Sequence, residues 1–459
     1  MDKRQFLKGS CSILTGTMLS RFVSAETAQQ TLEQAAHQTA PRTNWAGNLT
    51  FHTDTLYQPK TTEEVQHIVK SCDKLRALGR GHSFNAIADS THAQISLKQL
   101  DSIDIDAKAR TVTVGAGVTY GKLAPILDAQ GFAVHNLASL PHVSVIGACA
   151  TATHGSGSNN GNLATIVSAL EFVTADGSLH TLSRAKDGDR FLGAVVNLGG
   201  LGIVTKTTLD IIPTFQVAQV VYENLSFSQL EKHLDEIFLS GYSVSLFTTW
   251  ENHRANQVWI KRRLEPGITS VAFAPEFFGA KQATQKLHPV PGHVAEACTE
   301  QLGVPGPWYE RLPHFKLNFV PSSGAEIQTE YFVPREHAYE AILAVEELHD
   351  KITPHLFITE LRTIAADNLW LSMAYQRPSL AIHFTWKPEW DAVQQILPLI
   401  EARLAPFNPR PHWAKVFTIP PATIQASYAK MPDYKTLLNH HDPQGKFRNQ
   451  FLDTTLFSA

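Results

Sequence analysis

The sequence predicts an α+β protein with two lobes, and three observations lead to this fold class. The chain has 459 residues, which is more than one ordinary hydrophobic core organises. Up to Pro213, short strands alternate with helices and glycine-rich turns. Beyond Pro213 the strands are longer and carry polar residues at alternate positions, which is typical of an antiparallel sheet. We therefore expect a first lobe over residues 45–213, a second over 214–405, and a C-terminal segment, 406–459, that returns to the first lobe.

Composition and charge exclude several classes of protein. Hydrophobic residues make up 43% of the chain and charged residues 18%, as in a well-packed globular protein. The formal net charge is -3, so neither nucleic acid nor an anionic membrane is predicted as a partner. The four cysteines form no C-x-x-C pair, so neither a zinc site nor a disulfide framework is indicated. No stretch approaches the roughly 20 apolar residues that a membrane-spanning helix needs.

Residues 1–25 have the layout of a signal peptide. A basic start precedes a weakly apolar stretch, and Val23-Ser24-Ala25 offers small residues at the cleavage positions. The start is similar to a twin-arginine export signal in which Lys3 replaces the first arginine. We expect a periplasmic or secreted protein, and the alternative is an uncleaved cytoplasmic extension. Residues 26–44 are polar and form a leader before the first ordered segment.

The elements of the first lobe follow from capping, alternation and turn signals. Thr61-Thr62-Glu63-Glu64 is a capping box in front of a helix predicted over 62–71. Asp176-Gly177 between two apolar runs predicts a hairpin. The other predicted elements are a helix over 120–130 and strands at 75–78, 101–106, 110–114, 170–174, 178–182 and up to about 212.

A glycine-rich turn follows the strand predicted at 75–78. Gly79 and Gly81 flank an arginine, and His82 comes next. Glycine lets the backbone approach a ligand closely, and backbone N–H groups at such a turn can meet the phosphates of a nucleotide. A neutral imidazole placed there is a nucleophile or a ligand. The alternative, which the motif alone leaves equally open, is an ordinary strand-to-loop turn with a surface histidine.

Residues 136–161 form a second region rich in glycine, small residues and hydroxyl groups. Their backbone amides and side-chain hydroxyls can surround a diphosphate. The region has no lysine in a Walker arrangement and no G-x-G-x-x-G between a strand and a helix, so neither a P-loop nor a Rossmann fingerprint is indicated. The alternative is a long surface loop, although loops of this length and composition are usually functional.

The second lobe is predicted as an antiparallel sheet with covering helices. Its loop-rich part, residues 263–325, contains many prolines. The predicted strands lie at 243–250, 257–261, 327–333, 356–364 and 380–386, and the predicted helices at 335–351 and 390–404.

Two pairs of polar residues mark one face of this sheet. Glu360 and Arg362 are two apart on one predicted strand, and His383 and Thr385 are two apart on another, so each pair shares a face. Lys415 lies in the tail with a histidine and a tryptophan just before it. These groups are candidates for a site, and the alternative is a solvated face with a surface ion pair.

The remaining histidines do not predict a metal site. His142 and His154 are not at metal-ligand spacing from any acidic residue, so structural roles are expected for both.

Taken together, the chain resembles the FAD-linked oxidases of the vanillyl-alcohol oxidase type, and among them most the alditol oxidases. The likeness covers about residues 44–455. It rests on the motifs Asn44-Trp45-Ala46-Gly47-Asn48, Gly81-His82-Ser83-Phe84-Asn85, Ser139-Leu140-Pro141-His142, Val304-Pro305-Gly306-Pro307-Trp308, Glu360-Leu361-Arg362-Thr363, His412-Trp413-Ala414-Lys415-Val416-Phe417 and Asp442-Pro443-Gln444-Gly445-Lys446-Phe447. The resemblance implies a PCMH-type FAD-binding lobe, an antiparallel-sheet substrate lobe and a C-terminal segment that reaches the flavin.

The resemblance also implies how FAD is held. His82 would bond covalently to the flavin 8α-methyl, as a single link, because no cysteine lies near Ser139-Leu140 to form a second one. The residues implied around the cofactor are Ala77, Leu78, Gly79, Arg80, Gly81, His82 and Ser83 at the diphosphate, Ser139, Ser144, Gly147, Thr151, Ala152, Thr153, His154 and Val204 along the rest, and His412 from the tail.

The implied reaction is oxidation of the C1 hydroxyl of a polyol such as xylitol or sorbitol, with oxygen reduced to hydrogen peroxide. Arg362 and Lys415 would stabilise the developing alkoxide. Glu360 would hold Arg362 and bind substrate, while Ser139 and Thr385 would bind further hydroxyls. His383 would support these groups or accept a proton. The general base stays open among His383, Lys415 and Glu360, and a monomer is expected.

Three alternative functions remain at this point. One is an aldonolactone oxidase or dehydrogenase of the same family. Another is a polyol dehydrogenase that passes electrons to an acceptor other than oxygen. The third, a secreted sugar-binding protein, would share the polar sheet face but would need neither glycine-rich region nor His82.

Overall fold

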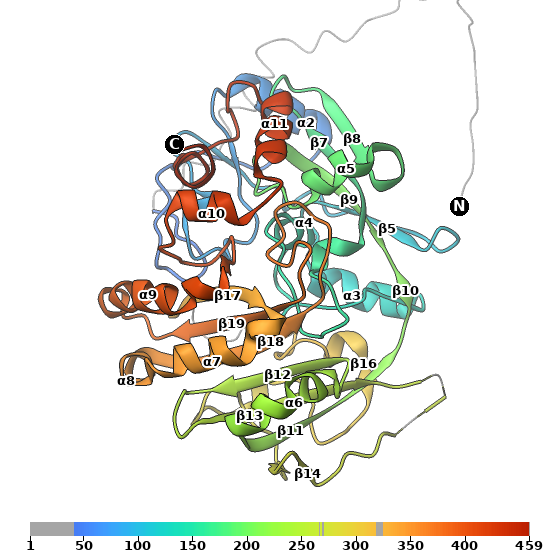
Figure 1. The fold of residues 1–459 in the computed structure, drawn as a ribbon. Helices are drawn as coiled ribbons and strands as arrows, with labels where there is room; N and C mark the ends of the chain where they lie inside the picture. The colour runs from blue at the N-terminus through green and yellow to red at the C-terminus, as the bar shows by residue number, and fades with distance from the viewer. Residues whose placement is uncertain (1–40, 266, 269, 318–324, 459) are drawn as a thin grey trace, which may run out of the picture. The chain divides into compact units, whose positions relative to one another are not determined.

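The computed structural model describes residues 41–265, 267–268, 270–317 and 325–458. The predicted signal peptide and residues 26–40 of the predicted leader lie outside the described residues. All the described residues belong to one compact unit. Within it, β1 to β10 make up three small sheets and β11 to β20 a single large one, with the change between Pro213 and Gln216 (Figure 1). The domain boundaries given above stay predictions.

The first lobe contains one parallel and two antiparallel sheets. The parallel sheet has the strand order β1 (Leu56–Tyr57), β3 (Gln94–Ile95), β2 (Arg76–Ala77). The five-stranded antiparallel sheet has the order β4 (Ile103–Asp106), β5 (Thr111–Gly115), β9 (Ile203–Asp210), β7 (Val167–Val173), β8 (Leu179–Ser183). A third pairs β6 (Phe132–Ala133) with β10 (Ile212–Pro213).

The helices of this lobe are α2 (Thr62–Ser71), α3 (Tyr120–Ala129), α4 (Val145–Ala150) and α5 (Arg184–Val195). The predicted start of α2 is confirmed, because Thr61 Oγ1 accepts a hydrogen bond from the backbone N–H of Glu64. The hairpin around Asp176-Gly177 is also present, as β7 and β8.

Two predictions in the first lobe need correction. The strand expected at 75–78 is only the two residues of β2: Leu75, just before it, donates its N–H to the carbonyl of Lys446 near the C-terminus, while Leu78, just after it, donates to the carbonyl of Ile95 in β3. The second glycine-rich region contains a helix, α4, which the small residues of the segment did not suggest. α4 is short but buries Val145, Ala148 and Cys149 in the core.

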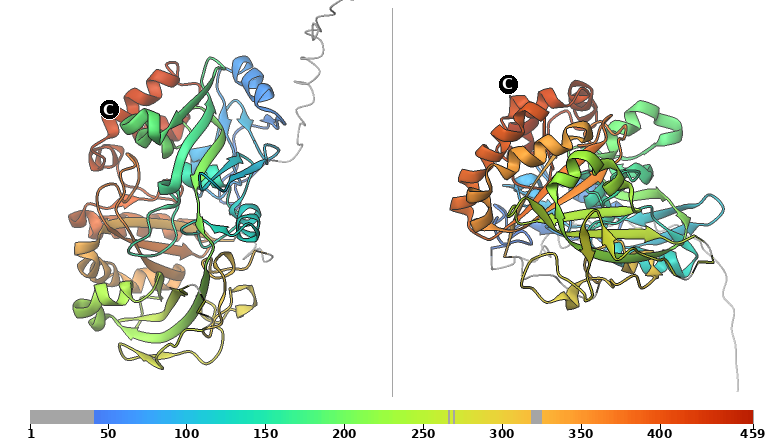
Figure 2. Two further views of the ribbon diagram at one scale, coloured as in Figure 1. Left: turned by 90° about the vertical axis from the view of Figure 1, so that its right-hand side faces the viewer. Right: turned by 60° about the horizontal axis from the view of Figure 1, so that its bottom comes forward.

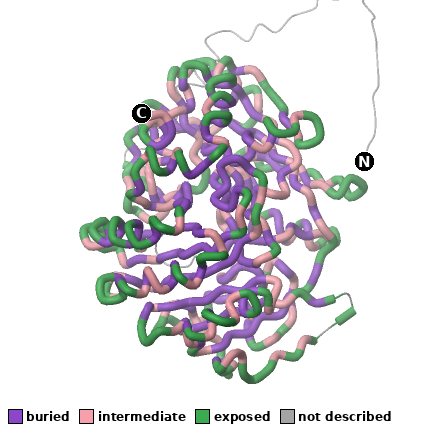
Figure 3. The backbone as a smooth tube through the Cα atoms, in the orientation of Figure 1, coloured by how far each residue is buried: buried purple, intermediate pink, exposed green. Residues whose placement is uncertain are grey.

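The second lobe is a ten-stranded antiparallel sheet. Its strand order is β14 (Glu276–Phe277), β15 (Ala280–Gln282), β11 (Gln216–Ser226), β13 (Arg254–Arg263), β12 (Ser243–Thr248), β18 (Leu356–Ile364), β19 (Ser379–Trp386), β17 (Ile327–Pro334), β20 (Arg410–Pro411), with β16 (Gly306–Pro307) paired to β11. The strands in the middle of the sheet are buried along nearly their whole length (Figure 3).

Helices cover one face of this sheet and leave the other face for the site. They are α6 (Phe227–Leu239), α7 (Ala338–Glu346), α8 (His349–Ile352) and α9 (Trp390–Leu404). Tyr331 of β17 donates to the carboxylate of Glu401 in α9 at 2.8 Å, so the side chain of Tyr331 lies on the helical face. Glu330, one residue earlier, therefore lies on the opposite face.

The single helix predicted over 335–351 is wrong. The segment is a short 3-10 turn followed by α7 and α8, and Leu348 between the two helices leaves the helical conformation, with φ -99° and ψ 9°. Both Leu348 and Ile352 are buried. The change of direction at Leu348 therefore accompanies the burial of both side chains. The sequence pattern predicts one continuous amphipathic helix instead.

The C-terminal segment packs on the first lobe. It contains α10 (Pro421–Ser427), α11 (Met431–His441) and α12 (Gln450–Leu452), which lie beside first-lobe elements in Figures 1 and 2. Asn449 donates its amide to the carbonyls of Ala86 and Asp89, both at 2.9 Å. No helix among the described residues is long and apolar enough to cross a membrane.

Candidate active site

One cavity of about 1060 Å³ connects the glycine-rich regions of the first lobe with the polar face of the large sheet. The turn after β2 and the helix α4 line it on the first-lobe side. β17, β18 and β19 line it on the second-lobe side, and residues 412–415 of the C-terminal segment complete the wall.

The turn after β2 places His82 at this cavity. Gly81 has φ +73°, a conformation that favours glycine, and an added Cβ would lie 3.4 Å from the backbone nitrogen of Trp45. The Trp45 ring stacks on the His82 ring with centroids 4.6 Å apart. Burial, together with the positive charge of Lys415, lowers the pKa of His82 to about 4. The imidazole is therefore neutral and has a free lone pair for bonding.

The start of α4 forms the adjacent part of the wall. Ser144 is the N-cap, but its side chain makes no capping hydrogen bond. A Cβ added at Gly147 would lie 2.6 Å from Ser144 Oγ, so a larger residue here would push the Ser144 hydroxyl aside. Hydroxyls of Ser83, Thr151 and Thr153 line the same part of the cavity. This is a donor-rich, sterically open cradle of the kind that a diphosphate needs.

The strand register brings three charged groups together on the sheet. His383 of β19 lies directly opposite Glu330 of β17 on one side and Glu360 of β18 on the other. Arg362 Nη2 donates to Glu330 Oε1 at 2.6 Å, and its Nε lies 3.6 Å from Glu360 Oε2. His383 Nδ1 is 3.4 Å from Glu330 Oε2, within ion-pair distance but without hydrogen-bond geometry.

These groups stabilise one another's charges in a buried setting. Burial disfavours ionisation of Glu330 and Glu360, but neighbouring side chains outweigh it: His154 and Arg362 hold the pKa of Glu330 well below its ordinary value, and Arg362 and His314 do the same for Glu360. The two carboxylates outweigh the effect of burial on Arg362 and raise its pKa. The cavity wall thus carries a fixed guanidinium between two fixed carboxylates.

Lys415 supplies a second cation from the C-terminal segment. Its ammonium donates to the amide oxygen of Gln328 and lies 4.8 Å from the centroid of the Phe84 ring. Burial lowers the pKa of Lys415 to about 8, against the opposing charge of Glu330. Asn85 donates to the carbonyl of Lys415 at 2.7 Å, so the residue is tied to the turn that carries His82.

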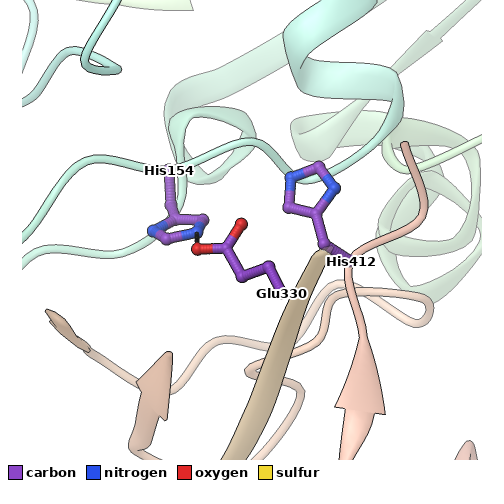
Figure 4. A group of neighbouring side chains, drawn as sticks. All are labelled: His154, Glu330 and His412. Carbon is purple, nitrogen blue, oxygen red and sulfur yellow. Dashed lines mark hydrogen bonds and ion pairs between the residues drawn. The ribbon is translucent and has the colours of Figure 1, made fainter. Parts of the chain in front are cut away.

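His154, Glu330 and His412 also meet the distance requirement for a metal site, because their ligand atoms lie within 4.8 Å of one another (Figure 4). The spacing along the sequence did not reveal this group, because His154 meets an acidic residue far along the chain: its Nε2 lies 3.1 Å from Glu330 Oε1. However, the same Glu330 oxygen accepts from Arg362, so the carboxylate already faces two donors. We assign the cluster to the ion network of the cavity wall and not to metal binding.

Most of the residues that the sequence predicts for the site line this cavity. Those that line the cavity are Ala77, Leu78, Gly79, Arg80, Gly81, His82, Ser83, Ser139, Ser144, Gly147, Thr151, Thr153, His154, Val204, Glu360, Arg362, His383, Thr385, His412 and Lys415. Ala152 does not: it has φ +52° and is completely buried beneath the cavity wall.

Sequence reasoning missed several residues of this wall, above all Glu330 and His314. Glu330 was detectable, because Gln328 and Glu330 are two apart on a predicted strand, in the same pattern as Glu360 and Arg362. His314 gave no such signal, since it lies in a loop-rich segment without periodicity.

A cavity of this size, with a glycine- and hydroxyl-rich end and a charged sheet face, defines a dinucleotide-dependent enzyme of the two-lobed flavoprotein class. Comparison with known proteins agrees. Residues 53–183 match the model of the FAD binding domain and residues 324–455 that of D-arabinono-1,4-lactone oxidase. Alditol oxidase of a Streptomyces species is 46% identical over 415 residues, which cover 89% of this chain and 97% of that protein. The chain belongs to the FAD-linked oxidases of the vanillyl-alcohol oxidase type, in the branch that contains alditol oxidase.

More distant relatives share the whole length. L-gulonolactone oxidase of Mus musculus is 26% identical over 434 residues, covering 90% of this chain and 98% of that one. The crystal structure of cholesterol oxidase from B. sterolicum has a TM-score of 0.72 at 15% identity, covering 91% of this chain and 96% of that chain, which shows the same two-lobed fold. The predicted fold class and the assignment as an FAD-dependent oxidoreductase are therefore confirmed.

The residues present fit FAD. The open cradle at Gly147 and the hydroxyls beside it suit a diphosphate, and the neutral, stacked His82 lies in the same cavity. The charged sheet face that completes the cavity is then available for a second molecule, the substrate.

Proposed function

We propose that the protein oxidises the terminal C1 hydroxyl of alditols such as xylitol and sorbitol to the aldehyde, with oxygen as electron acceptor. The observation that carries this proposal is the mixed-charge wall of Glu360, Arg362, His383 and Lys415 in the same cavity as His82. Bound FAD would take up the hydride from C1 and pass its electrons to oxygen, which gives hydrogen peroxide. The 46% identity to an alditol oxidase supports this substrate class over the lactones of the more distant relatives.

The charged groups of the wall suit the proton and charge changes of the reaction. Arg362 and Lys415 can stabilise negative charge on the C1 oxygen in a buried site, where such interactions are strong. Glu330 and Glu360 fix the guanidinium between them. A chain of hydroxyls needs several hydrogen-bonding partners, and Ser139 and Thr385 line the same cavity.

Among the candidate bases, the geometry favours His383. The pKa of Glu360 is held so low by its cationic neighbours that its carboxylate is a weak base. Burial lowers the pKa of His383, so its imidazole is neutral. Its Nδ1 lies 3.4 Å from Glu330 Oε2, and the carboxylate charge favours the tautomer with the proton on Nδ1; the Nε2 lone pair, 3.3 Å from Thr385 Oγ1, would then accept a proton.

A peroxide assay over a panel of alditols and aldonolactones tests the proposed function. We expect oxygen-dependent peroxide formation with xylitol and sorbitol, and little with gulono- and galactonolactone. Peroxide formation with the lactones alone would assign the protein to the lactone oxidases. Turnover of xylitol with an artificial dye but not with oxygen would instead indicate a dehydrogenase.

We further propose that His82 forms the only covalent bond to FAD, through its neutral imidazole. Acid precipitation of the wild-type protein should then leave the yellow colour in the pellet, whereas His82→Ala should release it into the supernatant. His142→Ala is the matched control, because this nearby histidine donates from Nε2 to the carbonyl of Leu317 and does not line the cavity. Colour in the supernatant of the wild-type protein would contradict the covalent bond.

Export by the twin-arginine route is a separate proposal. It rests on the basic start with Lys3-Arg4 and the small residues up to Ala25. N-terminal sequencing of protein from the native host should find a mature chain that begins close to residue 26. An intact Met1 would contradict export with cleavage.

A further inference from the structure

A buried lysine and a histidine lie beside Glu360, on the same face of the large sheet. Lys261 of β13 is 1% exposed and does not line the cavity. His314, in the loop before β17, lies between Lys261 and Glu360. Neither residue takes part in the proposed reaction.

Hydrogen bonds link Lys261 to His314 and His314 to Glu360, and in each of them the residue named first is the donor. The Lys261 ammonium has three N–H donors and three acceptors: the carbonyls of Leu312 at 2.5 Å and Pro313 at 3.1 Å, and His314 Nδ1 at 3.3 Å. Because Nδ1 accepts, the proton of the neutral imidazole is on Nε2. That Nε2 donates to Glu360 Oε1 at 2.8 Å.

The environment keeps this arrangement fixed. The rings of Phe247 and Trp259 contact His314 edge to face, with centroids 5.5 Å and 5.3 Å away, so the imidazole cannot turn freely. Burial lowers the pKa of His314 to about 4, so the ring is neutral. Burial also lowers the pKa of Lys261 to about 7, against the charge of Glu360, so the ammonium form is present at slightly acidic pH.

Because His314 donates to Glu360, the Glu360 carboxylate can only accept a hydrogen bond from a ligand. A carboxylate that accepts from His314 on Oε1 and lies beside Arg362 on Oε2 has no proton to donate. Its remaining lone pairs can only accept. A substrate group at this position must therefore be a donor, such as a hydroxyl, and a carbonyl or a methylene leaves a buried charge without its partner.

We propose that Lys261 and His314 are positioning residues that hold Glu360 as an acceptor for one particular hydroxyl of the alditol. The proposal rests on the proposed function and adds to it two residues that determine specificity. It gives a reason for burying a lysine next to the site although, unlike Arg362 and Lys415, Lys261 does not line the cavity: His314 lines the cavity and connects Lys261 to Glu360.

The test compares xylitol with a set of analogues that each lack one inner hydroxyl, at pH 6, where Lys261 holds its proton. For the wild-type enzyme, we expect kcat/KM to fall by roughly 10- to 100-fold for one analogue, the one without the hydroxyl that Glu360 accepts. In Lys261→Met and His314→Leu, discrimination at that same hydroxyl should shrink towards unity. His314→Gln should restore it, because an amide can accept from Lys261 and donate to Glu360. Lys281→Met, an exposed lysine of β15, is the matched control.

The outcomes separate the two proposals. An equal loss for all analogues in Lys261→Met and His314→Leu, or unchanged discrimination, would overturn the positioning role. A wild-type enzyme without any activity on alditols would overturn the proposed function instead. In that case ¹⁵N NMR of the His314 ring still decides the positioning role: an unprotonated Nδ1 at pH 6 that gains a proton in Lys261→Met supports it, and a protonated Nδ1 in the wild type overturns it.

Discussion

Replacing Arg362 with methionine is expected to lower kcat on xylitol by about 10²- to 10³-fold, because its proposed role is to stabilise the oxygen that gains negative charge. The same change leaves Glu330 and Glu360 buried without their shared cation. We therefore also expect the free energy of unfolding to fall by about 3–5 kcal/mol. Steady-state peroxide assays and thermal unfolding measure the two effects on one preparation.

Arg410→Met separates catalysis from stability. Arg410 is also buried, but it donates to the carbonyls of Ser427, Met373 and Tyr375 and does not line the cavity. It should lose stability while kcat stays within about a factor of three of wild type. Arg362→Met with normal kcat would remove the guanidinium from the chemistry.

The second large effect is expected for Glu330→Gln. Glu330 is 2% exposed and accepts from both Arg362 and His154, so its neutral replacement leaves the buried Arg362 guanidinium with Glu360 as its one remaining carboxylate partner among the described residues. We expect a loss of about 3–5 kcal/mol in the free energy of unfolding. Arg362 also loses the contact that fixes it, so kcat should fall by at least about tenfold.

The pH dependence of this stability difference has a definite sign. The pKa of Glu330 is well below its ordinary value of 4.5 in the folded protein, so its charge stabilises the fold above that pH. The advantage of the wild type over Glu330→Gln should be constant at neutral pH and shrink as the pH falls below about 4.5. Unfolding midpoints for both proteins between pH 3 and pH 7 measure it.

Glu401→Gln provides a control with the opposite sign. Glu401 is buried behind the same sheet and accepts from Tyr331 and Thr418, but burial raises its pKa. A raised pKa means that the stabilising contribution is present at low pH and is lost as the pH rises. If the stability difference from wild type changed with pH in the same direction for both variants, the network would not keep the pKa of Glu330 low as we describe.

Local signals predicted the regular elements well. The bounds expected for one helix, 62–71, one strand, 356–364, and another helix, 390–404, are those of α2, β18 and α9. Capping residues and alternation are properties of neighbouring residues, so a single sequence contains them. The prediction of one helix over 335–351 failed because the backbone leaves the helical conformation at the buried residue Leu348, and no local signal in the sequence marks that break.

The site could be predicted only in part for the same physical reason. Glu360 and Arg362 stand out because they are two residues apart on one strand. The contact between His154 and Glu330 joins residues 176 positions apart, and that between His314 and Glu360 spans 46. Such contacts depend on the order of strands in the sheet, and no periodicity along the chain reports that order.

The C-terminal segment determines when the active-site cavity can be completed during synthesis of the protein. Asn85 is tied to the carbonyls of Trp413 and Lys415, and Leu75 to that of Lys446. The pocket is therefore finished only after almost the entire polypeptide has left the ribosome. A prematurely terminated chain that ends before residue 412 has every residue of the His82 turn but lacks the pieces that brace it, so truncated products are expected to stay colourless.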